Sequence, residues 1–436
     1  MLEKIKIHIK NNFSFLKEKK LLLATSGGLD SMVMLHVFQQ LGYDIAIAHC
    51  NFQLRGLESF GDQSFIQEYA QEHQIPIFVT QFDTTAFAKD YKLSTQVAAR
   101  ELRYNWFYEL LETENYDYIL TAHHADDNLE TFLINLSRGT GLDGLTGIPE
   151  QNDKIIRPLL SVSREEILAF AKEKNIAWRE DSSNASDKYL RNKIRHDLVP
   201  LLKELNPLFM EAFQKTQSYL QESAAMVEDA TIMIYNQVVT QEEDLMYIDL
   251  KQLLRLPNYQ SYLYQWLKEF GFTAWDDIYE LVHAVSGKQI YASNFRLLKD
   301  REQLIVSPIE ENAEEDKYEI EKGIADVNVP LKLSLCKVDA ISNPSNTTIF
   351  VDEELLQFPL VIQKWNEGDL FQPFGMDGKS KKVSKLFKDE KLSLVEKENI
   401  WLLWSGETIV WIIGLRQDER FKVLATTKNI LKIQLL

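Results

Sequence analysis

Ser26-Gly27-Gly28-Leu29-Asp30-Ser31 is the stretch of sequence that decides the fold of this chain. It follows an apolar run, Leu21 to Thr25, and precedes a helix-like stretch that begins near Met32. Glycine adopts positive φ at little cost and lets the backbone approach a ligand closely. The start of a helix adds free N–H groups and the positive end of the helix dipole. A strand, a glycine turn and a helix in this order predict a binding site for a polyphosphate.

The same hexapeptide excludes two common nucleotide sites. It lacks the Gly-Lys-Ser/Thr ending of a Walker loop and the glycine spacing of a dinucleotide fingerprint. The alternative is a simple strand-turn-helix junction in which Asp30 or Ser31 only caps the helix. The pattern resembles the pyrophosphate loop of N-type ATP pyrophosphatases, which release pyrophosphate from ATP and leave an adenylylated oxygen on the substrate.

Composition limits the class of protein. With 436 residues, 45% of them hydrophobic, we expect roughly three packed domains. No apolar run reaches the roughly twenty residues that span a bilayer, and Met1 to Lys6 alternates charged and apolar residues, so we expect a cytoplasmic protein with no membrane partner. Cys50 and Cys336 are the two cysteines, which excludes a disulfide framework and a Cys-x-x-Cys pair.

Four apolar runs are typical of buried parallel strands. They are Leu21 to Thr25, Ile45 to His49, Ile75 to Phe82 and Tyr116 to Ala122. Helical stretches separate them, and this alternation predicts an α/β fold with a doubly wound parallel sheet. Ligands of such sheets bind at the carboxyl ends of the strands, where polar or glycine residues follow each run here.

Beyond these strands the chain changes character. We expect residues 1–205 to form the catalytic domain, 206–308 a mostly helical domain, 309–345 an acidic linker and connecting segment, and 346–436 a small α+β domain. The linker prediction rests on the acidic residues between Pro308 and Lys322. The last domain has β-favouring runs at Thr348 to Val351, Leu360 to Gln363 and Thr408 to Ile413, with turn signals at Glu367-Gly368-Asp369 and Asp377-Gly378.

A carboxylate cluster follows the fourth strand. In Thr121 to Thr131, a helix would place Asp126, Asp127 and Glu130 on neighbouring positions of one face. Such a cluster can hold magnesium or orient a cationic nucleophile, or it can simply complement the dipole of the helix N-terminus. His123 and His124 are adjacent, so they are poorly placed to bind one zinc ion together.

Cations are unevenly distributed in a chain whose net charge is −17. Arg100 and Arg103 share one side of a predicted helix and suit a transferring phosphate, although such pairs also form ordinary surface salt bridges. Two islands contain no acid, Lys188 to Arg195 and Gly378 to Lys388. Each alone is typical of a solvated face, but two islands in separate domains favour binding to a large folded RNA.

With these motifs the chain resembles the tRNA(Ile)-lysidine synthetase family, whose catalytic domain is a PP-loop, or adenine nucleotide α hydrolase-like, domain. The resemblance covers nearly the full length. Matching segments in the first half are Ser26 to Ser31, His49 to Ser59, Ala99 to Tyr104, Ala122 to Thr131, Arg138 to Leu145, Arg157 to Leu160, Glu180 to Asn184 and Arg191 to Arg195. In the C-terminal domain they are Gly368 to Met376, Lys381 to Phe387 and Gly414 to Phe421. Asn128, where Gln is expected, and Phe52, where His is common, depart from the pattern.

The resemblance implies an enzyme that uses ATP and Mg²⁺ to join the ε-amine of L-lysine to C2 of the wobble cytidine in the CAU anticodon of tRNA(Ile). The C2 oxygen is a poor leaving group, so ATP first converts it to an adenylate and pyrophosphate departs. The product, lysidine, pairs with A instead of G. A homodimer is compatible with the sequence.

The resemblance also implies roles for residues. Ser26, Gly27, Gly28, Leu29, Asp30 and Ser31 would bind ATP, and Asp30 would bind Mg²⁺. Arg100 would stabilise the developing phosphate charge, with Arg103 as a substitute. Glu130, with Asp126 and Asp127, would position the lysine ammonium and help remove its proton. Arg191 and Arg195 would approach the anticodon stem or the adenylate, with Arg191 also catalytic. The helical domain 206–308 and the C-terminal domain 346–436 would both bind tRNA. The residues expected to hold it farther out are Lys379, Lys381, Lys382 and Lys385.

Three rival functions differ in their chemistry. A tRNA thiolase of the same superfamily also adenylates a base oxygen, but it needs catalytic cysteines or a cysteine-held cluster. An amidating ligase needs a glutaminase domain or another ammonia source. A nucleotide-binding RNA chaperone would bind ATP without turnover, and the absence of ATP/pyrophosphate exchange would favour it.

Overall fold

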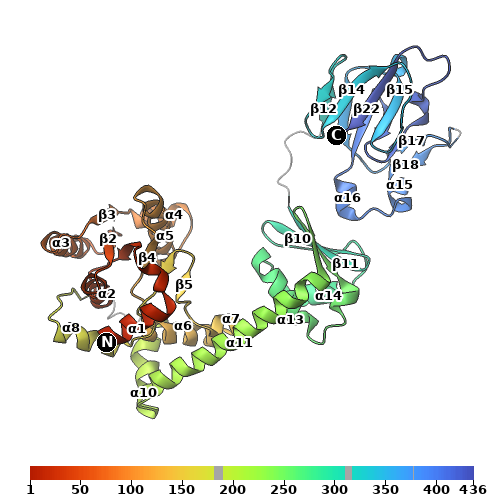
Figure 1. Cartoon of the computed structure of the whole chain (residues 1–436). Helices are drawn as coiled ribbons and strands as arrows, with labels where there is room; N and C mark the ends of the chain where they lie inside the picture. The colour runs from red at the N-terminus through yellow and green to blue at the C-terminus, as the bar shows by residue number, and fades with distance from the viewer. Residues whose placement is uncertain (181–189, 310–316, 377) are drawn as a thin grey trace. The chain divides into compact units, whose positions relative to one another are not determined.

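The computed structural model describes residues 1–180, 190–309, 317–376 and 378–436, and the chain divides into two compact units, residues 1–229 and 230–436. Figure 1 shows the chain coloured from the N-terminus to the C-terminus. Several sequence features lie outside the described residues: Asp181 to Asn184 of one family motif, Lys188 of the first basic island, Glu310 to Asp316 of the acidic linker, and Asp377 of a predicted turn.

The first unit contains a six-stranded sheet in the order β3-β2-β1-β4-β6-β5. The parallel strands are β1 (Lys20–Ala24), β2 (Asp44–Asn51), β3 (Ile77–Gln81), β4 (Tyr118–Leu120) and β6 (Ile155–Ile156), and β5 (Gln151–Asn152) is antiparallel to β6. All four predicted strands are present, and the doubly wound α/β fold is confirmed.

Helices precede, connect and follow these strands. They are α1 (Leu2–Asn12), α2 (Leu29–Gln40), α3 (Leu57–Glu72), α4 (Thr84–Asp90), α5 (Thr95–Thr113), α6 (Ala125–Arg138), α7 (Leu142–Leu145), α8 (Arg164–Glu173), α9 (Leu190–Lys193), α10 (Val199–Leu205) and the long α11 (Phe209–Val238). A π-helical turn, η3 (Ile194–Leu198), joins α9 to α10.

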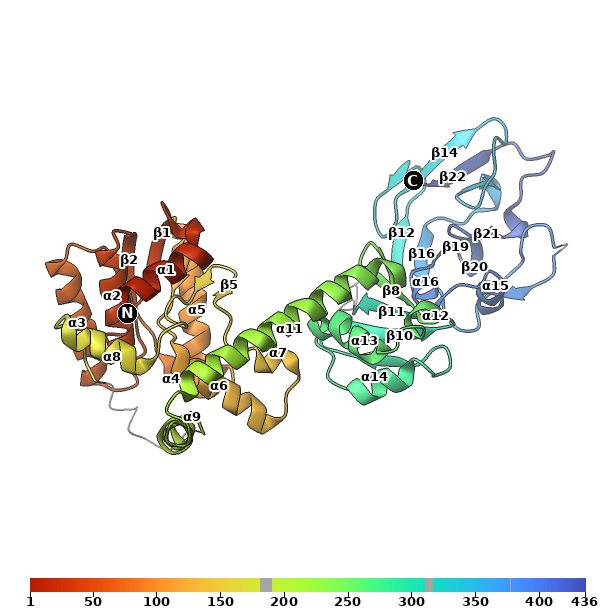
Figure 2. The same cartoon turned by 60° about the horizontal axis from the view of Figure 1, so that its bottom comes forward.

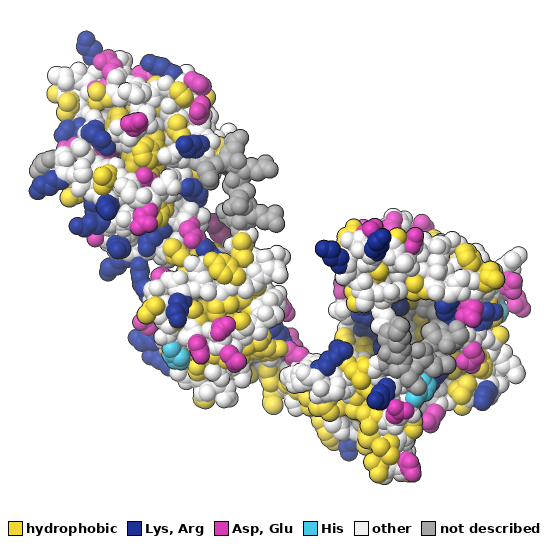
Figure 3. Space-filling model, turned by 180° about the vertical axis from the view of Figure 1, so that it is seen from behind, with side chains coloured by type: hydrophobic (Ala, Val, Ile, Leu, Met, Phe, Trp, Pro, Cys, Tyr) yellow, Lys and Arg dark blue, Asp and Glu magenta, His cyan; other side chains and the backbone are white. Residues whose placement is uncertain are grey.

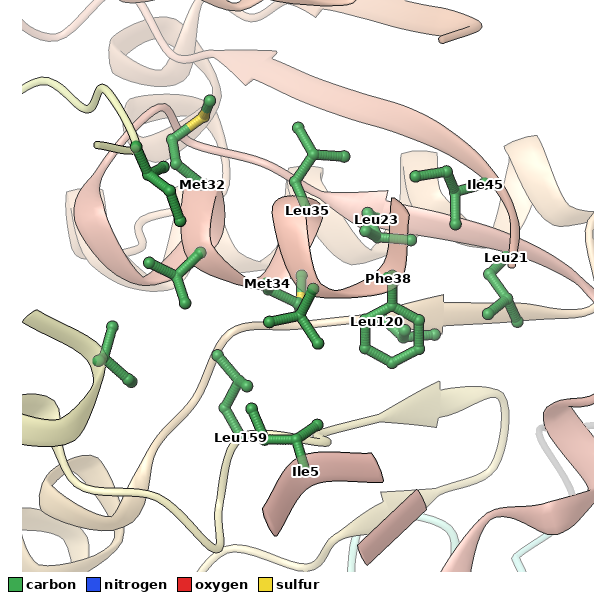
Figure 4. Close-up of a cluster of buried hydrophobic side chains, with 14 of the residues drawn as sticks. Ile5, Leu21, Leu23, Met32, Met34, Leu35, Phe38, Ile45, Leu120 and Leu159 are labelled. Atoms are coloured by element: carbon green, nitrogen blue, oxygen red, sulfur yellow. The ribbon is translucent and has the colours of Figure 1, made fainter. Parts of the chain in front are cut away.

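Helices bury both faces of the sheet. Because successive side chains of a strand point in opposite directions, neighbouring residues of β1 belong to different cores. Leu21 and Leu23 of β1 pack with α1, α2, α3 and α8 in one core. Leu22, between them, packs on the other face against Phe107 of α5. Figure 4 shows the first of these cores, and Figures 1 and 2 show α2, α3 and α8 on one side of the sheet with α5 on the other.

The order of the strands decides where a ligand can bind. From β1 the chain winds outward to β2 and β3, then returns to place β4 on the other side of β1. In open α/β sheets the crevice at such a reversal, at the carboxyl ends of the strands, is the usual binding site. The two segments that meet there are the glycine loop after β1 and His123 to Asp127 after β4.

The second unit holds three larger sheets. The first is β7-β8-β11-β10-β9, formed by β7 (Val239–Glu242), β8 (Leu245–Asp249), β9 (Gln289–Tyr291), β10 (Phe295–Asp300) and β11 (Gln303–Pro308). It packs with α12 (Leu250–Leu253), α13 (Tyr259–Leu267) and α14 (Trp275–Leu281). The helices expected in this region are present, and the antiparallel sheet is an addition that the helical prediction did not contain.

The remaining sheets contain the predicted C-terminal strands. One is β12 (Lys317–Ile320), β16 (Leu360–Lys364), β19 (Trp401–Ser405), β20 (Thr408–Ile412) and β21 (Arg416–Gln417). The other is β13 (Asp326–Val327), β14 (Leu333–Val338), β22 (Ile430–Leu435) and β15 (Thr348–Asp352). A short pair, β17 (Leu370–Phe371) and β18 (Lys381–Lys382), leads into α15 (Val383–Asp389) and α16 (Leu394–Glu398), so the α+β prediction is confirmed.

Over the described ranges, no helix combines the length and the apolar character needed to cross a bilayer.

Candidate active site

The glycine loop joins β1 to α2 and is held open by its own side chains. Gly27 has φ +88°, a backbone conformation that strains any other side chain, and a Cβ there would lie 3.3 Å from Ile66 Cδ1, so that side chain would have to shift by a few tenths of an ångström. The Ser31 hydroxyl donates to Gly28 O at 2.9 Å and accepts from Ser26 N at 3.2 Å. These contacts set the loop at the N-terminus of a twelve-residue helix, as an anion site requires.

A cavity of about 900 Å³ opens beside this loop, in the crevice that the strand order predicts. Its wall combines the loop, the start of α6, the start of α8, and the segment from α9 to α10. Among the residues that line it are Ser26, Gly28, Leu29, Asp30, Ser31, His123, Asp126, Asp127, Glu130, Arg191 and Arg195. The structure therefore brings the loop, the carboxylate cluster and part of the first basic island together in one pocket.

Glu130 is the most buried acid of the pocket, with a side chain 1% exposed. Arg191 Nε donates to Glu130 Oε2 at 2.7 Å, and Arg195 Nε donates to Oε1 at 2.6 Å. Both guanidinium groups also reach Asp127 Oδ1, at 3.3 and 3.4 Å. Two arginines from the island thus neutralise the carboxylates of α6 rather than forming an open cationic surface.

His124 links the loop to the carboxylate cluster. It caps α6, since its Nδ1 accepts from Asp127 N and its backbone N–H donates to Asp127 Oδ2. With Nδ1 as acceptor, the ring proton is on Nε2, which lies 3.7 Å from Asp30 Oδ2 and 3.4 Å from Asp127 Oδ2. The two carboxylates therefore face the same imidazole from different elements.

Asp30 is poised for a cation. Burial, together with the nearby charge of Asp127, raises the pKa of Asp30, against the opposing effect of His124. Its Oδ1 is buried and has no hydrogen-bond partner among the described residues. Although burial opposes it, the nearby imidazole of His124 and the charge of Arg191 lower the pKa of Asp127. No group of three or more His, Cys, Asp or Glu side chains suited to a metal was found in the described part of the chain. Two carboxylates are nevertheless a usual protein contribution to Mg²⁺, which takes its other ligands from water and phosphate.

Asp126, the third carboxylate, has a different neighbourhood. Its Oδ2 accepts from the backbone N–H of Arg164 at 2.8 Å, and its Oδ1 lies 3.3 Å from Lys203 Nζ. Lys203 also contacts Glu165 at 2.8 Å. The start of α8 and the middle of α10 are thereby fixed against the start of α6.

The two arginines of α5 are placed differently. Arg103 lines the pocket, its Cζ lies 5.1 Å from the centroid of the Tyr104 ring, and its buried Nε has no hydrogen-bond partner among the residues that the structure describes. Arg100 is exposed, does not line the pocket and lies over the ring of Tyr104, with its Cζ 4.9 Å from the centroid. The prediction that Arg100 contacts phosphate remains a prediction, and the geometry favours the substitute, Arg103.

Two further side chains near the carboxyl ends of the strands are held neutral. Burial lowers the pKa of His123 to about 4, helped by Arg157 and Arg103, and its Nδ1 pairs with the Thr121 hydroxyl at 3.0 Å. Burial raises the pKa of Cys50 to about 12. A thiol that stays protonated is a poor nucleophile, and Cys50 is the one cysteine in residues 1–229.

Other residues of the family motifs have structural roles. Arg157 is buried and donates to Pro149 O at 2.6 Å. The carboxylate of Asp62 forms ion pairs with Arg55, at 2.8 Å from Nη2 to Oδ2, and with Arg179, at 2.6 Å from Nε to Oδ1. Asn128 is buried, bonds to Gln217 of α11 and accepts from Ile148 N at 2.7 Å, so this departure from the family pattern lies in helix packing.

The second basic island, Gly378 to Lys388, lies in the other unit and includes most of α15. Lys379, Lys382 and Lys385 are exposed, and Lys381 is partly buried against Asp389 at 2.8 Å. Figure 3 shows Lys and Arg side chains gathered along one side of this unit. The island is therefore available to a polyanion.

Sequence reasoning missed part of the pocket wall: Arg164, Glu165, Trp178, Arg179 and Lys203. Arg164 and Glu165 follow the matching segment Arg157 to Leu160 closely, and that proximity was a usable signal. Lys203 had none, because a lysine in an amphipathic helix is ordinarily a surface residue.

Three family models match the chain: a PP-loop domain at residues 1–202, a TilS substrate binding domain at 241–309 and a TilS substrate C-terminal domain at 360–434. A tRNA(Ile)-lysidine synthase of Parabacteroides distasonis is 40% identical, with all of both chains covered. The enzyme of the same name from Bacteroides thetaiotaomicron is 37% identical over 97% of each chain. That of Bacillus subtilis is 31% identical over 94% of this chain and 92% of its own. Full-length similarity of this kind, together with the pocket described above, establishes that the chain belongs to the tRNA(Ile)-lysidine synthase family.

Proposed function

We propose that this chain is an ATP-dependent ligase that joins the ε-amine of lysine to C2 of the wobble cytidine in the CAU anticodon of tRNA(Ile). The modification changes decoding from AUG to AUA. The observation that carries the proposal is one pocket in which an anion-binding glycine loop faces buried carboxylates and two arginines. Such a pocket suits ATP on one side and a cationic nucleophile on the other. The thiolase alternative is not favoured, since the pocket's unit has a single cysteine, the partly buried Cys50, whose pKa is raised to about 12.

The first step activates the base. The C2 oxygen of the cytidine attacks the α-phosphorus of ATP, an O–P bond forms, the bond from that phosphorus to the bridging oxygen breaks, and pyrophosphate leaves. Backbone N–H groups of the glycine loop at the start of α2 that do not donate within the loop receive the departing pyrophosphate. Arg103, whose Nε on the pocket wall has no hydrogen-bond partner among the described residues, stabilises the charge that develops on the phosphate.

Asp30 and Asp127 fit a magnesium ion, because both are carboxylates, both face His124, and Asp30 Oδ1 has no partner among the described residues. When bound, Mg²⁺ would neutralise phosphate charge.

The second step forms the product. The neutral ε-amine of lysine attacks C2, a C–N bond forms, the C–O bond to the adenylate breaks, AMP leaves, and the nitrogen loses a proton. Glu130 and Asp127 hold the ammonium and take part in removing its proton. These acids are paired with Arg191 and Arg195 here, so lysine binding requires at least one guanidinium to turn toward the adenylate phosphate.

The tRNA is held in two places. The exposed lysines around α15 contact the RNA backbone, and Arg191 and Arg195 approach the anticodon side. A cytoplasmic location, where ATP and tRNA are both present, belongs to the same proposal, and the homodimer remains a prediction.

To test the proposal, purified protein is incubated with ATP, Mg²⁺, labelled lysine and unmodified tRNA(Ile). The tRNA is then treated with mild alkali, digested to nucleosides and separated. Label that survives on a cytidine-derived nucleoside supports the proposal, because an aminoacyl ester hydrolyses under these conditions. If folded protein leaves no such label while the correct tRNA is present, the proposed reaction is wrong.

A further inference from the structure

One part of the pocket wall is made of four charged side chains from three helices. Asp126 comes from α6, Arg164 and Glu165 from the first turn of α8, and Lys203 from α10. The Lys203 ammonium lies 3.3 Å from Asp126 and 2.8 Å from Glu165. Two carboxylates of the wall therefore share one ammonium group.

Arg164 is the fourth member and is differently engaged. Its backbone N–H donates to Asp126 Oδ2 at 2.8 Å, which fixes the residue beside that acid. Its side chain is partly buried, and within the described ranges its guanidinium has no hydrogen bond or ion pair. Guanidinium groups form strong paired hydrogen bonds with carboxylates and phosphates. An unpaired one on a pocket wall indicates a site for an anionic group of a ligand.

The four charged residues of this wall have no net charge together. Two carboxylates and two cations line this part of the pocket, so it suits a ligand that carries both signs. A free amino acid carries an ammonium and a carboxylate that are both bonded to its α-carbon. The polyphosphate of ATP carries one sign only, and the charges of Asp126 and Glu165 would repel it.

The spacing between Asp126 and Glu130 along α6 matches the length of a lysine side chain. Asp126 and Glu130 are four residues apart on one helix face, which is a rise of about 6 Å. The four-carbon stem of lysine can bridge a gap of this size, with its ε-amine at Glu130 and its α-carbon near Asp126.

We propose that Asp126, Arg164, Glu165 and Lys203 form a zwitterion subsite for the α-carbon end of the substrate lysine. Arg164 and Lys203 bind the α-carboxylate, and Asp126 and Glu165 bind the α-ammonium. This assignment rests on the proposed function and adds a source of selectivity to it. The enzyme distinguishes a free amino acid from an amine with the same reactive end and no carboxylate.

The test compares L-lysine with cadaverine, which keeps the chain and the reacting amine but lacks the carboxylate, and with lysinamide, in which the carboxylate is neutral. For each amine, kcat/KM is measured from the rate at which the modified nucleoside forms. The nucleoside is identified by its mass after the tRNA is digested. The wild type should prefer lysine to both by at least about tenfold, since one charge-assisted hydrogen bond is involved. Arg164→Gln should lower kcat/KM for lysine by about 10-fold to 100-fold and leave the value for cadaverine within about twofold. The KM for ATP should stay the same.

The matched control is Lys172→Gln. Lys172 is exposed on the same helix and does not line the pocket, so this variant should leave both amines unaffected. Arg164→Lys, which keeps the charge and loses the paired geometry, should lie between the wild type and Arg164→Gln.

Each other outcome is decisive. If Arg164→Gln slows both amines equally and raises the KM for ATP, Arg164 serves the phosphates and the subsite is wrong. If the wild type uses cadaverine or lysinamide as well as lysine, the subsite is wrong even when no Arg164 variant folds. If the wild type forms no product from lysine, the proposed function fails and this assignment fails with it.

Discussion

Glu130→Gln tests how the pocket is held together. The substitution keeps the shape of the side chain but removes the charge that two guanidinium groups share. Glu130 is 1% exposed and accepts three hydrogen bonds, from Arg191 Nε at 2.7 Å and from Arg195 Nε and Nη2 at 2.6 and 3.0 Å. In the variant, one carboxylate oxygen becomes an NH₂ group that faces a cation.

The expected loss of stability follows from the burial of the partners. Removing one partner of a fully buried ion pair costs about 3–5 kcal/mol. The side chains of Arg191 and Arg195 are 41% and 21% exposed, so water can compensate in part, and Asp127 remains as a second partner. We therefore expect the free energy of unfolding of residues 1–229 to fall by about 2 kcal/mol, below that range.

The assay is urea denaturation of the full chain, with hydrogen exchange on α6 to assign the transition to the first unit. Glu173→Gln is the control, because Glu173 forms an exposed pair with Lys174 and its loss should cost under about 0.5 kcal/mol. A loss for Glu130→Gln no larger than the control would refute the idea that these ion pairs stabilise the pocket. Lysine affinity is measured in parallel, and an unchanged value would exclude Glu130 from positioning lysine.

Three further predictions concern other parts of the molecule. Arg103→Ala should lower the rate of tRNA-dependent pyrophosphate release by about 100-fold, the effect of losing one preorganised donor, whereas Arg100→Ala should change it less than about threefold, and the reverse result would restore Arg100 to the catalytic role. The pKa of His123 is about 4 in the folded chain and about 6.5 unfolded, so the unfolded state binds more protons between these values and stability falls as the pH falls. Between pH 7 and pH 5 the loss from this residue should be about 2 kcal/mol by urea denaturation, and it should vanish in His123→Gln. The double variant of Lys382 and Lys385 to Gln should reduce the slope of log tRNA affinity against log salt by about 2, and an unchanged slope would remove the island around α15 from the tRNA interface.

Local patterns predicted the catalytic unit well, because its signals are short in sequence. The run Leu21 to Thr25 and the glycines after it specify a strand, a turn and a helix through residues in direct succession. The region 239–308 was harder. The pairing of β8 with β11 joins residues up to sixty positions apart, so no local window shows it, whereas β10 and β11 form a local hairpin that the helical prediction did not contain.

The two arginines of α5 show which features of the pocket follow from local sequence and which do not. Arg100 and Arg103 both lie on the face of α5 that carries buried Phe107, at two turns and one turn from it. Helical periodicity places them on the same side, and only the packing of α5 on the sheet decides that Arg103 meets the pocket and Arg100 lies outside it.

By itself, the sequence determined the family, the strand-turn-helix loop, the face of α6 that carries the acids, and the presence of two basic islands, since each depends on residues within a few positions of one another. Tertiary structure alone decided the partners of those acids. Arg191 and Arg195 are more than sixty residues from Glu130, and Lys203 is 77 residues from Asp126, yet each lies within hydrogen-bond reach. Opposite charges that folding buries in one pocket must pair, and no periodicity along the chain shows which of them will meet.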